Sequence, residues 1–234
     1  MTRRLFAMLM TLTFAVLPAR SQKFTVTPKT SGGIEINIPA MNAQQIHSKS
    51  LPSAPEAVDL GLSVKWASCN VGAQRPEEYG SYFAWGETEE RDNYDWEDYL
   101  YYDANAKDNI NIGTDICGTK YDVAHVKWGE GWRMPTEVEC KELLEKCTSE
   151  WVVFNKIHVR RFTGPNGNSI FLPMAGHRWG NEVKRAGKAG DYWSGTPFMG
   201  KERSAYFISM VFEYASWLTY REREYGRCVR PVTK

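Results

Sequence analysis

Two segments of the chain gather side chains that bind ligands by stacking and hydrogen bonding. Residues 177–182 hold a tryptophan among Arg, Asn and Glu, and residues 214–225 mix Trp and Tyr with Arg and Glu. Planar rings stack on sugar faces or anchor protein contacts, and Arg and Glu add directional hydrogen bonds. The candidate ligand-binding residues are Arg178, Trp179, Glu182, Tyr214, Trp217, Tyr220 and Arg221. The alternative is that Trp217 and Tyr220 only cover a sheet.

Nucleophilic catalysis needs a nucleophile beside an oriented base, and the sequence offers no such pair. It contains no Gly-x-Ser-x-Gly motif, and residues 193–195 are interpreted as a turn after a core aromatic. His125 falls on an expected helix and His158 at an expected strand start. His177, which follows a glycine in an expected loop, is the histidine of most interest. We therefore assign no catalytic residue.

Metal and phosphate sites also lack their usual patterns. Residues 92–98 supply carboxylates, but their spacing lacks the alternation and central glycine of a calcium-binding EF-hand. We interpret them as a solvated acidic loop. The sugar-binding triplets of calcium-dependent lectins, Glu-Pro-Asn and Trp-Asn-Asp, are absent, and the glycines at 164 and 167 belong to an expected hairpin turn. The sequence therefore predicts no metal and no cofactor.

The chain has five cysteines, so at least one thiol has no partner within the chain. Their spacing matches no zinc pattern. Cys140 and Cys147 share an expected helix at a separation of about 10 Å, which is too far for a disulfide between them. We interpret the cysteines mainly as small buried apolar groups, with their pairing left open: Cys69, Cys117, Cys140, Cys147 and Cys228.

The elements that position these residues begin with short strands and two helices. Residues 62–67 and 82–85, each bounded by glycine, predict strands, and residues 87–120 form a long polar and aromatic excursion. Asp122 can cap a short helix that extends to residue 128. The clearest helix starts at Thr136, which forms a capping box with the glutamate three residues later. Its predicted apolar face consists of Val138, Leu143, Leu144 and Cys147.

From residue 151 onward the pattern indicates strands and turns. Residues 160–163 and 169–172 flank a hairpin turn, and residues 205–212 are apolar on both parities, which is typical of a strand covered on both faces. Residues 216–220 and 227–232 predict two more strands. Two helices against many antiparallel strands give an α+β class.

Six segments in order resemble a known family. They are DLGLSVKWASCNVGA (59–73), YFAWGE (82–87), WGEGWRMPT (128–136), GPNGNSIFLPMAG (164–176), DYWSGT (191–196) and GRCVRPV (226–232). The series resembles the Fibrobacter succinogenes major paralogous domain, a family found mainly in exported proteins of Bacteroidetes and their relatives. The resemblance covers residues 58–232.

That family is similar to the C-type-lectin-like fold, which formylglycine-generating enzymes and variable proteins of diversity-generating retroelements share. The resemblance implies two helices packed on twisted antiparallel sheets, with the two ends of the domain paired. It implies that Val229 and Val232 are buried, that Arg230 lies on or near the closing strand, and that the two candidate segments lie where such folds contact ligands.

The formylglycine-generating enzymes act through a cysteine pair that binds copper. In this sequence Cys69 is expected on the opening strand, where it could neighbour Cys228 across the sheet. We favour a structural disulfide or two buried thiols over a copper site. Cys140 stands where family members often carry an aromatic residue, which predicts local repacking.

The first residues of the chain are typical of an exported protein. Two arginines precede an uncharged apolar run at residues 5–17, and Pro18 and small residues at 19 and 21 follow. The run is shorter than the roughly 20 residues that span a bilayer, so residues 1–21 are interpreted as a cleavable signal peptide. Residues 22–56 are a leader or linker with a possible short hairpin, and residues 57–234 form the domain.

We expect the mature protein to begin at or near Gln22, because small residues occupy the two positions that a signal peptidase reads. N-terminal sequencing of the exported protein measures this. A protein recovered with Met1 at its start would mean that residues 1–21 remain as an anchor.

Charge and hydropathy limit the partners. Residues 1–21 carry three of the 29 Lys and Arg and none of the 28 Asp and Glu, so their removal leaves a formal charge of −2. No long basic run is present, which argues against nucleic acid or an anionic membrane as partners, and no membrane span is expected after cleavage.

We therefore expect a periplasmic, cell-surface or secreted non-enzymatic binding or adhesion module that recognises an extracellular glycan or protein. The alternatives are an enzyme on a formylglycine-generating-like scaffold and a structural component of a surface appendage. The ligand and the oligomeric state stay open.

Overall fold

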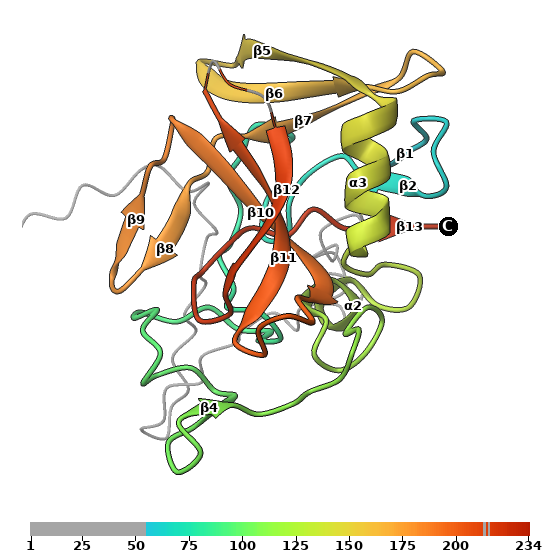
Figure 1. Cartoon of the computed structure of the whole chain (residues 1–234). Coiled ribbons are helices and arrows are strands. Elements are labelled where there is room, and N and C mark those ends of the chain that lie inside the picture. The colour runs from blue at the N-terminus through green and yellow to red at the C-terminus, as the bar shows by residue number, and fades with distance from the viewer. Residues whose placement is uncertain (1–54, 213, 215) are drawn as a thin grey trace, which may run out of the picture. The chain divides into compact units, whose positions relative to one another are not determined.

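The computed structural model describes residues 55–212, 214 and 216–234. The expected signal peptide, and the leader as far as residue 54 with its expected hairpin, lie outside the described residues. Those described fall within one compact unit, Pro52–Lys234. They form a mostly β structure with two short helices and several small antiparallel sheets (Figure 1). Across the described ranges no helix is long and apolar enough to cross a membrane.

The two ends of the described chain meet in one sheet, as expected. β2 (Lys65–Ala67) lies between β1 (Ala57–Val58) and β13 (Val232–Thr233), and both pairings are antiparallel. Val229 and Val232 are fully buried, and Arg230 is 1 % exposed just before β13. The closing strand is shorter than predicted, because residues 227 and 228 form only isolated bridges.

The strand predicted at residues 82–85 is wrong. Only Phe83 forms a bridge, with Arg227, and the chain turns at Gly80 and Gly86, which both have left-handed backbones. These glycines bend the segment at both ends, so a regular ladder has no room to extend.

The central sheet consists of β10 (Ala189–Pro197), β11 (Ser204–Val211) and β12 (Ser216–Glu222) in antiparallel order. β11 is buried on both faces, as its composition predicted. The turn predicted at residues 193–195 is wrong: these residues belong to β10, where the pairing with β11 shifts register between Trp193 and Pro197. One face of the sheet packs into a core with Tyr192 and Ile208, and the other into a second core with Trp193 and Phe207.

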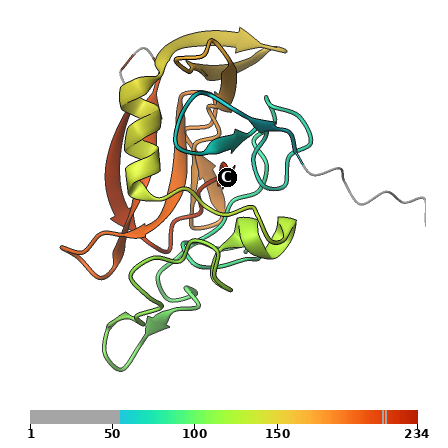
Figure 2. The same cartoon turned by 90° about the vertical axis from the view of Figure 1, so that its right-hand side faces the viewer.

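Both predicted helices are present. α2 (Val123–Trp128) is capped by Asp122, and α3 (Glu137–Lys146) begins at the capping box of Thr136 and Glu139. α3 lies along the central sheet (Figure 2). Its core face differs from the prediction, since Val138 is 69 % exposed while Cys140, Leu143 and Cys147 are buried.

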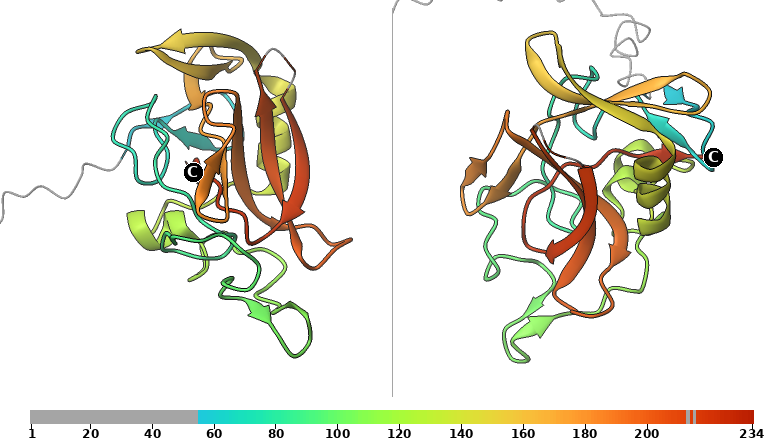
Figure 3. Two further views of the ribbon diagram at one scale, coloured as in Figure 1. Left: turned by 90° about the vertical axis from the view of Figure 1, so that its left-hand side faces the viewer. Right: turned by 45° about the horizontal axis from the view of Figure 1, so that its top comes forward.

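Three smaller sheets complete the structure. β5 (Thr148–Phe154), β6 (Ile157–Thr163) and β7 (Ser169–Pro173) form a meander, which confirms the hairpin turn after residue 163. β8 (His177–Trp179) pairs with β9 (Glu182–Lys184). The excursion at 87–120 contains only β3 (Tyr102–Asp103) and β4 (Asp108–Asn109), at one end of the unit (Figure 3).

Candidate functional site

The β8–β9 hairpin holds the first candidate segment, which the sequence indicated as a loop. Its entry lies against β10, where Gly176 N–H donates to the Ala189 carbonyl at 2.7 Å. Arg178 and Gly226 exchange two backbone hydrogen bonds, of 2.7 and 3.0 Å. Glycine is required at 176, because its φ is +67° and a Cβ there would lie 2.0 Å from the Lys184 carbonyl oxygen. The two candidate segments are therefore joined at the backbone, with Gly226 directly after the second one.

One face of the central sheet presents polar and aromatic side chains in rows across the strands. Asp191, Ser209 and Trp217 are direct cross-strand partners, and Phe207 pairs with Thr219 in the next row. Side chains of directly opposed residues lie about 4.5–5.5 Å apart at Cβ on the same face. Alternation along β12 therefore places residues 217, 219 and 221 on this face.

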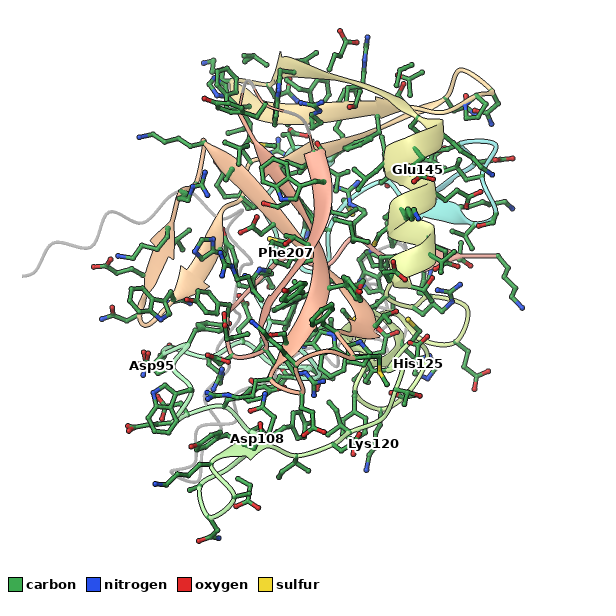
Figure 4. All side chains as sticks on the ribbon, viewed as in Figure 1. Asp95, Asp108, Lys120, His125, Glu145 and Phe207 are labelled. Carbon is green, nitrogen blue, oxygen red and sulfur yellow. The ribbon has the colours of Figure 1, made fainter. Side chains whose placement is uncertain are left out.

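A pocket of about 470 Å³ opens over this face. Phe207, labelled in Figure 4, lies in the central sheet and belongs to its lining. The sheet, the β8–β9 hairpin and the segment after β12 all contribute: His177, Arg185, Asp191, Phe207, Ser209, Trp217, Thr219, Arg221, Tyr225 and Arg227. The volume lies within the roughly 300–1,000 Å³ of small-molecule pockets.

A short polar chain crosses the pocket. His177 Nδ1 lies 2.9 Å from Asp191 Oδ2, and Ser209 Oγ donates to Asp191 Oδ1 at 3.0 Å. Asp191 is 4 % exposed and Ser209 7 % exposed. The carboxylate thus orients the imidazole ring of His177 through Nδ1, and the other ring nitrogen is not engaged in this contact. The chain therefore offers fixed hydrogen-bonding groups beside the ring of Tyr225, whose centroid is 5.7 Å from that of His177.

Arg227 supplies a buried positive charge at the same pocket. It is 2 % exposed, and its guanidinium carbon lies 4.2 Å from the ring centroid of Trp193 and 4.1 Å from that of Phe207. Its Nε and Nη1 atoms are buried without a hydrogen-bond partner among the described residues. Aromatic faces attract the cation but accept no conventional hydrogen bond from it.

Of the seven predicted binding residues, the structure places Trp217 and Arg221 in the pocket lining. Trp217 is 42 % exposed. Trp179 is 52 % exposed and adjoins the pocket through Tyr225, since the two rings stack at 6.4 Å with an interplanar angle of 11°.

The other four predicted residues do not line the pocket. Tyr220 lies on the opposite face of β12 and stacks on Phe198 at 3.6 Å. Arg178 donates to the carbonyl oxygens of Arg91, Asp92 and Asn181, each at 3.2 Å, and so holds the excursion to the hairpin. The last two predicted residues, Glu182 and Tyr214, face solvent, and Glu182 pairs with Lys184.

The arrangement lacks the contacts of a nucleophilic site. In a serine triad the hydroxyl bonds the histidine, whereas Ser209 Oγ donates to Asp191. All five cysteines are free thiols, and only Cys117 is not buried. Burial raises the pKa of both Cys69 and Cys228, which disfavours the thiolate that binds metal. Within residues 55–212, 214 and 216–234, no cluster of three His, Cys, Asp or Glu side chains is placed to hold a metal ion.

Comparison with known proteins defines no family for this fold and pocket. The chain matches no protein-family model, no curated protein and no solved structure.

Most of the polar residues that line the pocket were not predicted from the sequence. Asp191, Ser209 and Arg227 lie inside segments that the sequence indicated as motif or core. A charged residue inside an otherwise apolar strand motif is the one signal that marks Asp191 and Arg227, and Ser209 has no such signal. That signal is shared by Arg230, whose role is structural.

Proposed function

We propose that this chain is a secreted or cell-surface non-enzymatic binding module that recognises a glycan or protein in the pocket between the β8–β9 hairpin and the central sheet. The observation that carries the proposal is that both candidate segments contribute to one pocket, with His177 from the first and Trp217, Thr219, Arg221 and Tyr225 from the second. Aromatic rings beside fixed polar groups are the usual composition of a recognition site.

We also propose that the domain has the C-type-lectin-like fold of the family that its six motifs resemble. Support comes from the order of those motifs along the chain. It also comes from the pairing of the first and last strands beside two short helices. The signal peptide expected at residues 1–21 supports an extracellular or periplasmic place of action.

Support for a non-enzymatic role comes from the hydrogen bonding of Ser209 and from the buried thiols of Cys69 and Cys228. The enzyme alternative predicts copper-dependent oxidase turnover by the purified protein. The appendage alternative predicts co-purification in a surface polymer. Reproducible binding on a glycan array, or to one extracellular protein, supports the binding module.

Trp217→Ala is expected to reduce ligand affinity about thirtyfold or more without changing the melting temperature. Aromatic anchors typically contribute about 2 kcal/mol to binding, and Trp217 is 42 % exposed on the pocket face. Affinity is measured for the array ligand by calorimetry, and stability by thermal unfolding.

Tyr220→Ala is the matched control, since it removes an aromatic from the other face of the same strand. It is expected to lower the melting temperature, because its ring stacks on Phe198, and to leave affinity unchanged. If Trp217→Ala kept its affinity, or if Tyr220→Ala lost it equally, the assignment of the pocket would be wrong.

A further inference from the structure

Two buried arginines lie three residues apart near the end of the chain, and their surroundings differ. Arg230 donates to four oxygen atoms, those of the Asn70 side chain and of the Ala67, Ser68 and Phe171 carbonyls, at 2.8 to 3.1 Å. Arg227 is as buried, yet its Nε and Nη1 have no such acceptor among the described residues. Hydrogen bonds within the fold therefore account for the buried guanidinium of Arg230, whereas Nε and Nη1 of Arg227 have none among the described residues.

Asp191 does not satisfy Arg227. No salt bridge joins the two among the described pairs, and both Asp191 oxygens already bond His177 and Ser209. Burial lowers the pKa of Arg227 to about 10, while the Asp191 charge acts in the opposite direction. The guanidinium therefore stays protonated near neutral pH and lacks a counter-ion in direct contact. A buried cation in this state destabilises the fold unless something else compensates it.

The pocket as a whole carries an excess of positive charge. Its lining contains Arg185, Arg221 and Arg227 against the single carboxylate of Asp191. Arg221 is exposed at the end of β12, and Arg185 follows β9. Since a cleft lined by one sign of charge concentrates ions of the other sign, an anionic ligand is favoured at this place.

The remaining lining has the aromatic and hydroxyl groups that bind a sugar ring. Trp217 and Tyr225 supply planar faces, and the hydroxyl oxygens of Ser209 and Thr219 can accept hydrogen bonds from ring hydroxyl groups. We propose that this pocket binds an acidic saccharide, whose carboxylate or sulfate is held by the guanidinium of Arg227. The inference rests on the proposed binding function and adds the charge class of the ligand. Arg is suited to this contact, because its planar fork donates two hydrogen bonds to one anionic group.

The test compares saccharides with and without an acidic group and adds an acidic peptide. The mature protein is titrated by calorimetry with tetragalacturonate, with its methyl ester, with a sulfated tetrasaccharide of otherwise neutral sugars, and with tetraglutamate. The acid or the sulfate is expected to bind at least about tenfold more tightly than the ester, as charge-assisted hydrogen bonds require. Tighter binding of the acid identifies a carboxylate, and tighter binding of the sulfated sugar identifies a sulfate.

Arg227→Met is expected to reduce the affinity for the charged sugar about thirtyfold and to raise the melting temperature of the free protein by about 2 °C or more, since it removes a buried charge whose Nε and Nη1 lack hydrogen-bond acceptors among the described residues. Arg221→Met, at an exposed position, is expected to weaken the same binding without altering the melting temperature. Arg161→Met, on β6 away from the pocket, is the control and should change neither quantity.

The outcomes separate the two proposals. Equal affinity for the acid, the sulfate and the ester would overturn the anionic ligand and leave the binding module standing. Binding of tetraglutamate alone would also overturn it. Failure to bind any saccharide or protein would overturn both. An Arg227→Met protein that is destabilised yet binds the charged sugar normally would show that Arg227 is a structural residue.

Discussion

Arg230→Met is expected to lower the free energy of unfolding by about 4 kcal/mol or more. The side chain is 1 % exposed, and its guanidinium donates to four oxygen atoms from two parts of the chain, residues 67–70 and Phe171. Methionine fills much of the same volume but donates no hydrogen bond. Each buried acceptor that loses its donor costs about 1–3 kcal/mol, and the whole domain is expected to have only about 5–15 kcal/mol.

Urea unfolding followed by tryptophan fluorescence measures this change. Arg75→Met is the control, because the Arg75 side chain is 67 % exposed and pairs with Glu78 at 2.9 Å on the surface. Such exposed pairs contribute about 0–1 kcal/mol. An Arg230→Met protein as stable as the control would mean that the four hydrogen bonds do not hold the closing segment to the opening segment and to β7.

Asp122→Ala is expected to cost at least about 3 kcal/mol, which is more than an ordinary helix cap. One carboxylate oxygen accepts from the Ala124 and His125 N–H groups, and the other accepts from Gly118 and Met134 at 2.8 Å. A cap alone contributes about 0.5–2 kcal/mol. The other two N–H groups belong to neighbouring segments, and each loses a partner in the interior at about 1–3 kcal/mol.

Thr136→Ala is the matched control, since Thr136 caps α3 and accepts from the Glu139 N–H at 3.2 Å. It is expected to cost about 0.5–2 kcal/mol. Asp122→Asn is expected to be nearly as harmful as Asp122→Ala, because its amide group would face two N–H donors. If Asp122→Ala and Thr136→Ala lowered the free energy of unfolding equally in urea, Asp122 would contribute no more than an ordinary helix cap.

The helices were predictable because their signals are local. Asp122 and the capping box at Thr136 define two helix starts within a few residues of sequence. The core face of α3 was predicted less well. Val138 fits a helical stripe, but α3 meets the sheet along a face that Cys140 and Leu143 share, so Val138 faces solvent. The local sequence pattern does not specify which face of the helix is buried, because that depends on tertiary packing.

The strands of the site depend on distant partners. Residues 193–195 contain a Ser-Gly pair that favours a turn, yet β11 pairs across them and accommodates the glycine with a register shift. The β8–β9 hairpin likewise forms where Gly226, far along the chain, bonds Arg178. The sequence alone does not reveal these contacts, because the backbone conformation of each segment depends on a pairing partner that is distant in the sequence.

The sequence indicated both segments that meet at the pocket, but only Trp217 and Arg221 of the seven candidate residues line it. Trp217 and Tyr220 are three positions apart in one strand, so the alternation of side chains puts them on opposite faces. Arg227 looked like part of a structural motif. Only its lack of acceptors, which is a tertiary property, distinguishes it from Arg230.

The pairing of Trp66 with Val232 has a consequence for the time order of synthesis. These residues are 166 positions apart, so at about 5–20 residues per second a ribosome needs about 8–33 s between them. During that interval β2 has β1 beside it but lacks β13, and Arg230 has not yet been made. The sheet that joins the two ends of the domain and the hydrogen bonds of Arg230 therefore form only after residues 230–233 have left the ribosome. A chain in which this sheet is still incomplete suits passage through a narrow export channel, which agrees with the proposed destination of this protein.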